Sequence, residues 1–201
     1  KDRPCTNIQT GPVSGGGSLK DLAKYLDAGE ESLYMREEAT ETKVKNIPLN
    51  KSKVLAFATH GLLSGELEGL AEPALVLTPP INPTDQDDGL LKASEVAQLK
   101  LDADLVILSA CNTASADKPG AKGLSGLAKA FFFAGARALL VSHWPVESNA
   151  ASALTTNMFQ RLEANPLMGR AEALRQSMMT LANKPETAHP FFWAPFVVVG
   201  E

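Results

Sequence analysis

The chain has 201 residues, 44% of them hydrophobic, enough for one well-cored domain. Its 19 basic and 23 acidic residues give a formal net charge of −4, so the composition offers no electrostatic case for binding nucleic acid or an anionic membrane surface. The longest apolar stretch, residues 128–142, is interrupted by Lys129 and Arg137 and is too short to cross a bilayer. We therefore expect neither nucleic acid nor membrane as a direct partner.

The amino-terminal part of the chain carries weak structural signals. Residues 1–18 include a linker-like Gly- and Ser-rich run and are predicted to be irregular. Apolar residues at helical spacing predict a short helix over residues 18–28, and a weaker pattern predicts a second helix over residues 37–46. Because residue 1 is Lys rather than Met, we expect the chain to be a processed or excised piece.

Two short apolar runs predict buried strands that each lead to a reactive side chain. Residues 54–59 are followed by His60 and Gly61, and residues 105–108 are followed closely by Cys111. Cys111 comes 51 residues after His60, long enough for a crossover that returns a parallel neighbouring strand. Parallel strands end at the same edge of a sheet, so the pattern predicts a thiol beside an imidazole.

The other elements alternate between helix and strand. A long surface excursion over residues 65–88 contains one short predicted strand, residues 75–78. Helices are predicted over residues 94–99, 123–134, 151–163 and 170–181, and strands over residues 138–142 and 196–199. This alternation predicts an α/β fold with a mostly parallel central sheet covered by helices on both faces.

Cys111 is the leading candidate for a chemical role. A cysteine nucleophile needs a base or a positive field nearby, because an ordinary thiol is only slightly ionised at neutral pH. Gly61 could present an exposed backbone N–H that stabilises an oxyanion together with the N–H of Cys111. The alternative is a buried core cysteine, a common fate of a free thiol.

The remaining cysteine and histidines leave other assignments open. A Cys5–Cys111 disulfide is formally possible, but a reduced, cytoplasmic setting fits two lone cysteines better. His143 also closes a predicted strand and competes with His60 as the base. His189 lies in an aromatic segment and is expected to pack or hydrogen-bond. With no C-x-x-C pair and scattered histidines, no metal site is predicted.

Several separated motifs, in the same order along the chain, resemble those of bacterial CHAT domains, which are caspase-like cysteine peptidase domains often joined to tetratricopeptide repeats. The resemblance covers about residues 37–201, and residues 1–36 are left as a poorly assigned amino-terminal segment or linker. The matching motifs include Phe57-Ala-Thr-His60-Gly61, Leu105-Val-Ile-Leu-Ser-Ala-Cys111-Asn-Thr113, Gly126-Leu-Ala-Lys-Ala-Phe, His143-Trp-Pro-Val146 and His189-Pro-Phe-Phe-Trp-Ala-Pro-Phe196.

The resemblance implies a caspase-like three-layer sandwich and peptide-bond hydrolysis. It implies His60 as the catalytic imidazole and Cys111 as the nucleophile, with the backbone N–H groups of Gly61 and Cys111 holding the oxyanion. His143 stands where many members have Leu before Trp, so it is demoted. The chemistry requires no metal or organic cofactor.

Substrate contacts are implied at three further positions. Ser109 stands where caspases carry a glutamine that helps to select aspartate, so an aspartate preference is not expected. Glu147, after Trp144 and the two residues that follow it, is the nearest positional match to an acidic residue that receives a basic side chain in separase-like relatives. The alternative for Glu147 is a solvated loop residue.

The resemblance as a whole predicts a cysteine endopeptidase that acts on protein substrates and is regulated by an attached or partner sensor module, such as a tetratricopeptide-repeat domain. Two alternatives stay open. The domain could be a non-catalytic interaction module that keeps the caspase-like fold, or an amidase or acyltransferase that uses the same pair of residues.

Overall fold

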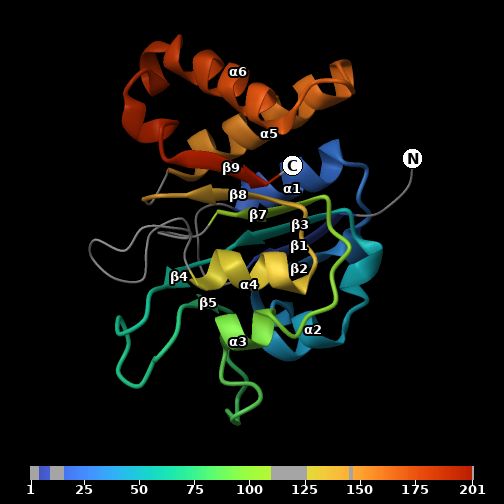
Figure 1. Cartoon of the computed structure of the whole chain (residues 1–201), viewed down its shortest axis with the longest axis vertical. Coiled ribbons are helices and arrows are strands. Elements are labelled where there is room, and N and C mark those ends of the chain that lie inside the picture. The colour runs from blue at the N-terminus through green and yellow to red at the C-terminus, as the bar shows by residue number, and fades with distance from the viewer. Residues whose placement is uncertain (1–4, 10–15, 110–125, 145–146, 201) are drawn as a thin grey trace.

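The computed structural model describes residues 5–9, 16–109, 126–144 and 147–200. A six-stranded sheet in the order β2-β1-β3-β7-β8-β9 runs through its centre (Figure 1). The first five strands in this order are parallel, and β9 closes the sheet antiparallel to β8. The strands are β1 (Cys5–Gln9), β2 (Leu33–Met35), β3 (Val54–Ala58), β7 (Leu105–Leu108), β8 (Ala138–Ser142) and β9 (Phe196–Gly200).

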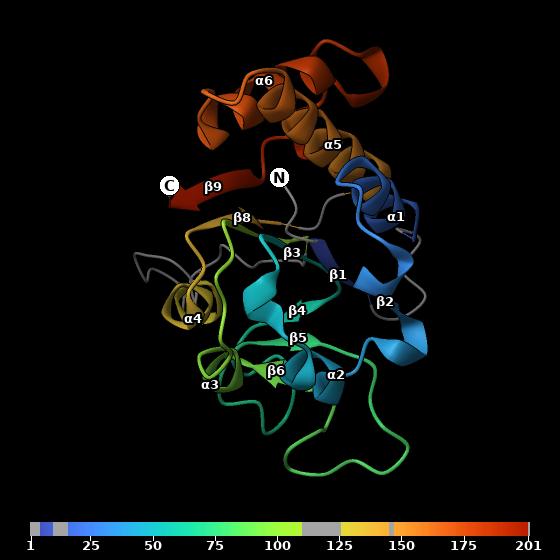
Figure 2. The same ribbon diagram turned by 90° about the vertical axis from the view of Figure 1, so that its right-hand side faces the viewer.

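Helices cover both faces of this sheet, as the view in Figure 2 shows. One face carries α1 (Gly16–Tyr25), α5 (Ser148–Ala164) and α6 (Arg170–Ala182). The other face carries α2 (Glu41–Asn46), α3 (Ala93–Val96) and α4 (Gly126–Ala134). Short 3-10 turns occupy Glu30–Ser32, Arg36–Glu38, Leu49–Lys51, Pro185–Thr187 and Pro190–Phe192.

A second, small antiparallel sheet lies in the layer of α2, α3 and α4 (Figure 2). It has the order β4-β5-β6, with β4 at Gly61–Leu62, β5 at Ala74–Val76 and β6 at Leu90–Lys92. Strand β4 begins only three residues after β3 ends. The small sheet is therefore built directly onto the end of the strand that leads to His60.

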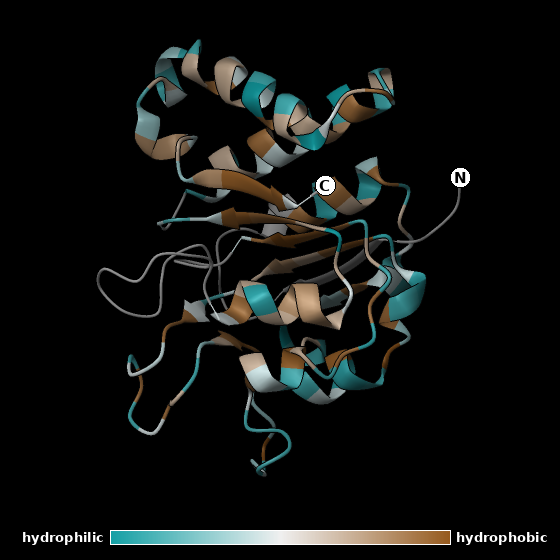
Figure 3. Ribbon diagram, in the orientation of Figure 1, coloured by the Kyte–Doolittle hydropathy of each residue, from teal (hydrophilic) through white to brown (hydrophobic). Residues whose placement is uncertain are grey.

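Side-chain alternation along the central strands divides the core into two apolar clusters. In β7, Val106 and Leu108 join one cluster, whereas Leu105 and Ile107 join the other. All four side chains are buried, as expected for a parallel strand covered on both faces. The strands are accordingly the most hydrophobic part of the ribbon, and the outer helices show mixed polar and apolar positions (Figure 3).

The structure confirms the predicted fold class, a caspase-like α/β sandwich with a mostly parallel central sheet. Every helix and strand predicted after residue 36 has a counterpart within a few residues where the structure describes the chain. The prediction that residues 1–18 are irregular is wrong for Cys5–Gln9, which form β1 between β2 and β3. The sequence Cys-Thr-Asn-Ile-Gln is too polar to resemble an interior strand.

Candidate active site

The carboxyl ends of β3 and β7 lie side by side, as the sequence predicts. The two strands are parallel neighbours whose register pairs Phe57 with Leu108. Just beyond the ladder, the Ser109 N–H donates to the Phe57 carbonyl oxygen over 3.0 Å. His60, three residues beyond Phe57, therefore follows β3 at the same sheet edge as half-buried Ser109.

Cys111 falls within residues 110–125, which lie outside the described part of the chain. Its role as nucleophile and the role of its backbone N–H therefore stay predictions.

The backbone of His60 is fixed by β5. The His60 carbonyl oxygen accepts the N–H of Val76 over 2.8 Å, and the Thr59 hydroxyl donates to the Val76 carbonyl oxygen. Thr59 is 4% exposed, whereas the His60 side chain is exposed. These two bonds hold the His60 carbonyl group and the Thr59 side chain against β5, and the imidazole is left accessible to a substrate.

The backbone N–H of Gly61 points away from β5. Gly61 pairs with Leu75 in the antiparallel ladder. In the adjacent pair, the Val76 N–H donates to the His60 carbonyl oxygen. Antiparallel ladders alternate between hydrogen-bonded and non-bonded pairs, so Gly61 belongs to a non-bonded pair. Strand β4 is an edge of the small sheet within the described residues, and the Gly61 N–H is directed toward that edge. This direction suits the predicted oxyanion donor.

His143 flanks the same strand from the other side. Strand β8, which leads to His143, is the second parallel neighbour of β7. The His143 N–H donates to the Pro195 carbonyl oxygen over 3.0 Å, and its side chain is exposed. Strand order alone therefore does not choose between His60 and His143, and the choice of His60 rests on the family resemblance.

His189 has the hydrogen-bonding role that the sequence predicts. Its Nδ1 accepts the N–H of Phe191 over 3.2 Å and so caps the short turn Pro190–Phe192. The nearby Trp144, half-buried, donates from Nε1 to the Phe191 carbonyl oxygen over 3.3 Å. Trp144 thus ties the end of β8 to the aromatic segment that precedes β9.

Glu147 has a structural role that the sequence analysis missed. Its two carboxylate oxygens accept the N–H groups of Asn149 at 2.9 Å and Ala150 at 2.8 Å, which caps the amino terminus of α5. The helix begins at Ser148, three residues before the predicted start at residue 151, and an acidic residue close to a helix start is the signal that could have shown this role. The side chain is exposed, and its predicted contact with a substrate stays a prediction.

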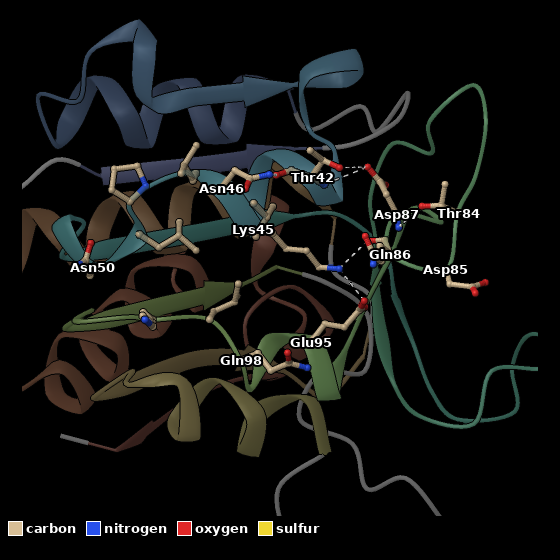
Figure 4. A pocket seen from close by; sticks show the side chains of 16 residues that line it. Thr42, Lys45, Asn46, Asn50, Thr84, Asp85, Gln86, Asp87, Glu95 and Gln98 are labelled. Carbon is tan, nitrogen blue, oxygen red and sulfur yellow. Dashed lines mark hydrogen bonds and ion pairs between the residues drawn. The ribbon is translucent and has the colours of Figure 1, made fainter.

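A polar cavity of about 840 Å³ lies in the α2 and α3 layer, between α2, the loop at residues 84–87 and α3 (Figure 4). Its walls include Thr42, Lys45, Gln86 and Glu95. The cavity includes none of the predicted site residues that the structure describes. Within the described residues, no group of three or more His, Cys, Asp or Glu side chains is arranged to hold a metal ion.

The position of Cys5 in the sheet is relevant to the possible Cys5–Cys111 disulfide. Cys5 pairs with Val54, which pairs with Leu105, so Cys5 lies at the amino-terminal end of the sheet. Ser109, the last described residue before Cys111, lies at the opposite, carboxyl-terminal end of the sheet. Because Cys111 lies outside the described part of the chain, the reduced state of the two cysteines stays a prediction.

No helix in the described ranges is both long and apolar enough to cross a membrane.

Comparisons with known proteins identify the family. The family model described as the CHAT domain matches residues 12–201. Human tetratricopeptide repeat protein 28 is 30% identical over 220 aligned residues, which cover 87% of this chain and 8% of that protein. The mouse protein of the same name is 35% identical over 111 residues, 55% of this chain and 4% of its own length.

The chain thus spans less than a tenth of the length of these relatives. Both are mammalian, so a bacterial origin stays a prediction, and their name agrees with the expected association with tetratricopeptide repeats. The chain belongs to the CHAT domain family.

Proposed function

We propose that this domain is a cysteine endopeptidase in which Cys111 is the nucleophile and His60 is the catalytic imidazole. The observation that carries the proposal is the register of β3 and β7. Phe57 is paired with Leu108, and His60 and Cys111 each follow these partners by three residues. Because Cys111 follows Ser109 by two residues in the chain, the Cα atom of Cys111 can lie no more than about 7 Å from that of Ser109. The Ser109 N–H is hydrogen-bonded to the Phe57 carbonyl oxygen of β3.

The proposed reaction is acyl transfer. The Cys111 sulfur attacks the scissile carbonyl carbon, and its proton passes to His60, which then protonates the departing amine. The backbone N–H groups of Gly61 and Cys111 stabilise the oxyanion. Water, deprotonated by His60, attacks the thioester and regenerates the thiol. The exposed imidazole and the outward direction of the Gly61 N–H support these roles.

On the substrate side, we propose Ser109, Trp144 and Glu147 as contacts. Ser109 lies at the edge of the sheet beside β3, two residues before the proposed nucleophile in the sequence. The carboxylate of Glu147 is exposed at the start of α5, where it favours a basic side chain before the cut over an aspartate. An attached or partner tetratricopeptide-repeat module is proposed to regulate access to the site.

A peptide-library cleavage assay tests the proposal. We expect the wild-type chain and Cys5→Ala to cleave the same peptides, and Cys111→Ala and His60→Ala to lose cleavage. Turnover in Cys111→Ala equal to that of the wild type would exclude the mechanism. Hydrolysis of small amides or esters without peptide cleavage would instead indicate an amidase or acyltransferase. Failure of a thiol-reactive acyl probe to label Cys111 in preference to Cys5 would indicate a non-catalytic module.

A further inference from the structure

We propose that Glu41, at the start of α2, is a positioning residue that holds the backbone of His60 through a short series of main-chain hydrogen bonds. This inference rests on the proposed function for the catalytic role of His60, but the mechanical link that it describes can be measured separately. Glu41 belongs to none of the strands that surround the proposed active site.

The Glu41 carboxylate is buried and hydrogen-bonded. The residue is 0% exposed, although it lies in the first turn of a helix where a glutamate normally faces solvent. Oε2 accepts the backbone N–H groups of Asp88 at 3.0 Å and Gly89 at 3.3 Å, and Oε1 is paired with Lys45. The carboxylate therefore fixes the point at which the surface excursion returns to β6.

Main-chain bonds connect this point to His60. Gly89 donates its N–H to Glu41 and accepts the N–H of Leu77 at its carbonyl oxygen over 2.7 Å. The next residue back, Val76, donates its N–H to the His60 carbonyl oxygen over 2.8 Å. Two residues, Gly89 and Leu77, thus separate the buried carboxylate from Val76, whose N–H anchors His60.

Gly89 permits the close approach that this connection needs. Its φ is +83°, a conformation that side chains rarely adopt. A Cβ atom at this position would lie 2.9 Å from the Cα atom of Pro79. The two arms of the excursion therefore pack backbone against backbone at Gly89, one of the two residues whose N–H groups Glu41 accepts.

Lys45 completes the anchor from the next turn of α2. Its ammonium group contacts Glu41, the Gln86 carbonyl oxygen at 2.8 Å and Glu95 Oε1 at 2.8 Å, and Figure 4 shows it reaching into the space between Gln86 and Glu95. Three partners match the three donors of an ammonium group. Glu95 in turn accepts the backbone N–H of Lys92 over 2.9 Å. Burial raises the pKa of Glu41 above its ordinary value, and the hydrogen bond from Lys45 opposes this rise. Through Lys45 and Glu95, α2, α3 and β6 are held to one another.

The test compares Glu41→Gln with the wild-type chain. Glutamine keeps the size of the side chain, but its amide group places N–H donors against Lys45 or against the N–H groups of Asp88 and Gly89. Leu174→Ala is the matched control, because it removes a buried side chain from α6 in the opposite layer. The measured quantity is the amide hydrogen-exchange rate of Val76 divided by that of the amides in β8. This ratio reports directly whether Glu41 holds the hydrogen bond from Val76 to His60.

We expect Glu41→Gln to raise the Val76 exchange rate about tenfold relative to β8, and Leu174→Ala to leave this ratio unchanged. We also expect kcat for peptide cleavage to fall about tenfold with KM within about twofold, because the substrate contacts are untouched. A Val76 exchange ratio unchanged in Glu41→Gln, or changed equally in Leu174→Ala, overturns the inference.

Two further outcomes are decisive. If Glu41→Gln does not fold, Lys45→Met replaces it, and the same rise in Val76 exchange is required. If the wild-type chain cleaves no peptide, the proposed function fails, whereas the Val76 exchange ratio still decides whether Glu41 holds the strand pairing of His60.

Discussion

The hydroxyl of Thr59 donates to the carbonyl oxygen of Val76, and Val76 in turn donates its N–H to the residue that follows Thr59, His60. This reciprocal pairing joins the end of β3 to the small sheet. A buried threonine at this position therefore aligns the backbone of the proposed catalytic histidine.

We expect Thr59→Val to lower the free energy of unfolding by about 1 kcal/mol and to reduce kcat. Thr155→Val is the matched control, because Thr155 is 5% exposed and donates to the Ala151 carbonyl oxygen within α5. Urea denaturation and peptide turnover separate the two effects. Equal loss of turnover in both variants would show that Thr59 contributes stability alone.

Replacement of His60 should affect catalysis and not folding. Its side chain is exposed, so His60→Ala should change the free energy of unfolding by no more than about 0.5 kcal/mol. Loss of a general base should lower kcat by at least about 100-fold. His143→Ala, at the end of the other neighbouring strand, should retain turnover; the opposite result would assign the base to His143.

Phe57 should be a major determinant of stability. It is 0% exposed in the middle of β3, and its ring lies 5.5 Å from that of Phe131 on α4, centroid to centroid. Phe57→Ala should cost roughly 3–5 kcal/mol in urea denaturation. Phe133→Ala, on the same helix but 84% exposed, should cost less than about 0.5 kcal/mol. Similar costs for the two variants would contradict the described core.

The Asp88–Lys92 pair should make a small contribution to stability that disappears in acid. Burial raises the pKa of Asp88, but the Lys92 ammonium at 2.6 Å and the Leu90 N–H outweigh burial and hold the pKa below its ordinary value. A depressed carboxyl pKa contributes stability above the pKa of the unfolded chain, and this stability is lost as the pH falls through the folded value.

The wild-type chain should therefore be more stable than Asp88→Asn at neutral pH, by about 1 kcal/mol or less, since the pair is partly exposed. The difference should shrink below about pH 4. Urea denaturation at neutral and acidic pH measures it. A difference that grows on acidification would contradict the assigned charge state.

Local patterns predict the elements that bury continuous apolar runs. Residues 105–108 and 138–142 are buried throughout, so their strands and their place in the sheet follow from composition. Strand β1 escapes prediction because its pairing with β2 and β3, not its polar sequence, makes it a strand. The antiparallel direction of β9 likewise depends on where α6 ends, which periodicity does not encode.

The candidate site is predictable to a similar extent. The adjacency of β3 and β7, and hence the shared sheet edge, follows from two apolar runs at a crossover interval. The burial of Glu41 does not follow, because its partners Asp88 and Gly89 lie 47 and 48 residues away and a helix-start glutamate ordinarily faces water. The capping role of Glu147 is a local feature and could have been predicted from its place before α5.

The rate at which iodoacetamide alkylates Cys111, followed by mass spectrometry as a function of pH, tests the central claim most directly. Cys5 serves as the internal reference in the same chain. At about pH 6, we predict that Cys111 reacts at least tenfold faster than Cys5, and that His60→Ala removes this advantage. Alkylation of both thiols at one rate, with ordinary titration near pH 8.5 and no effect of His60→Ala, would contradict a thiol activated by that imidazole.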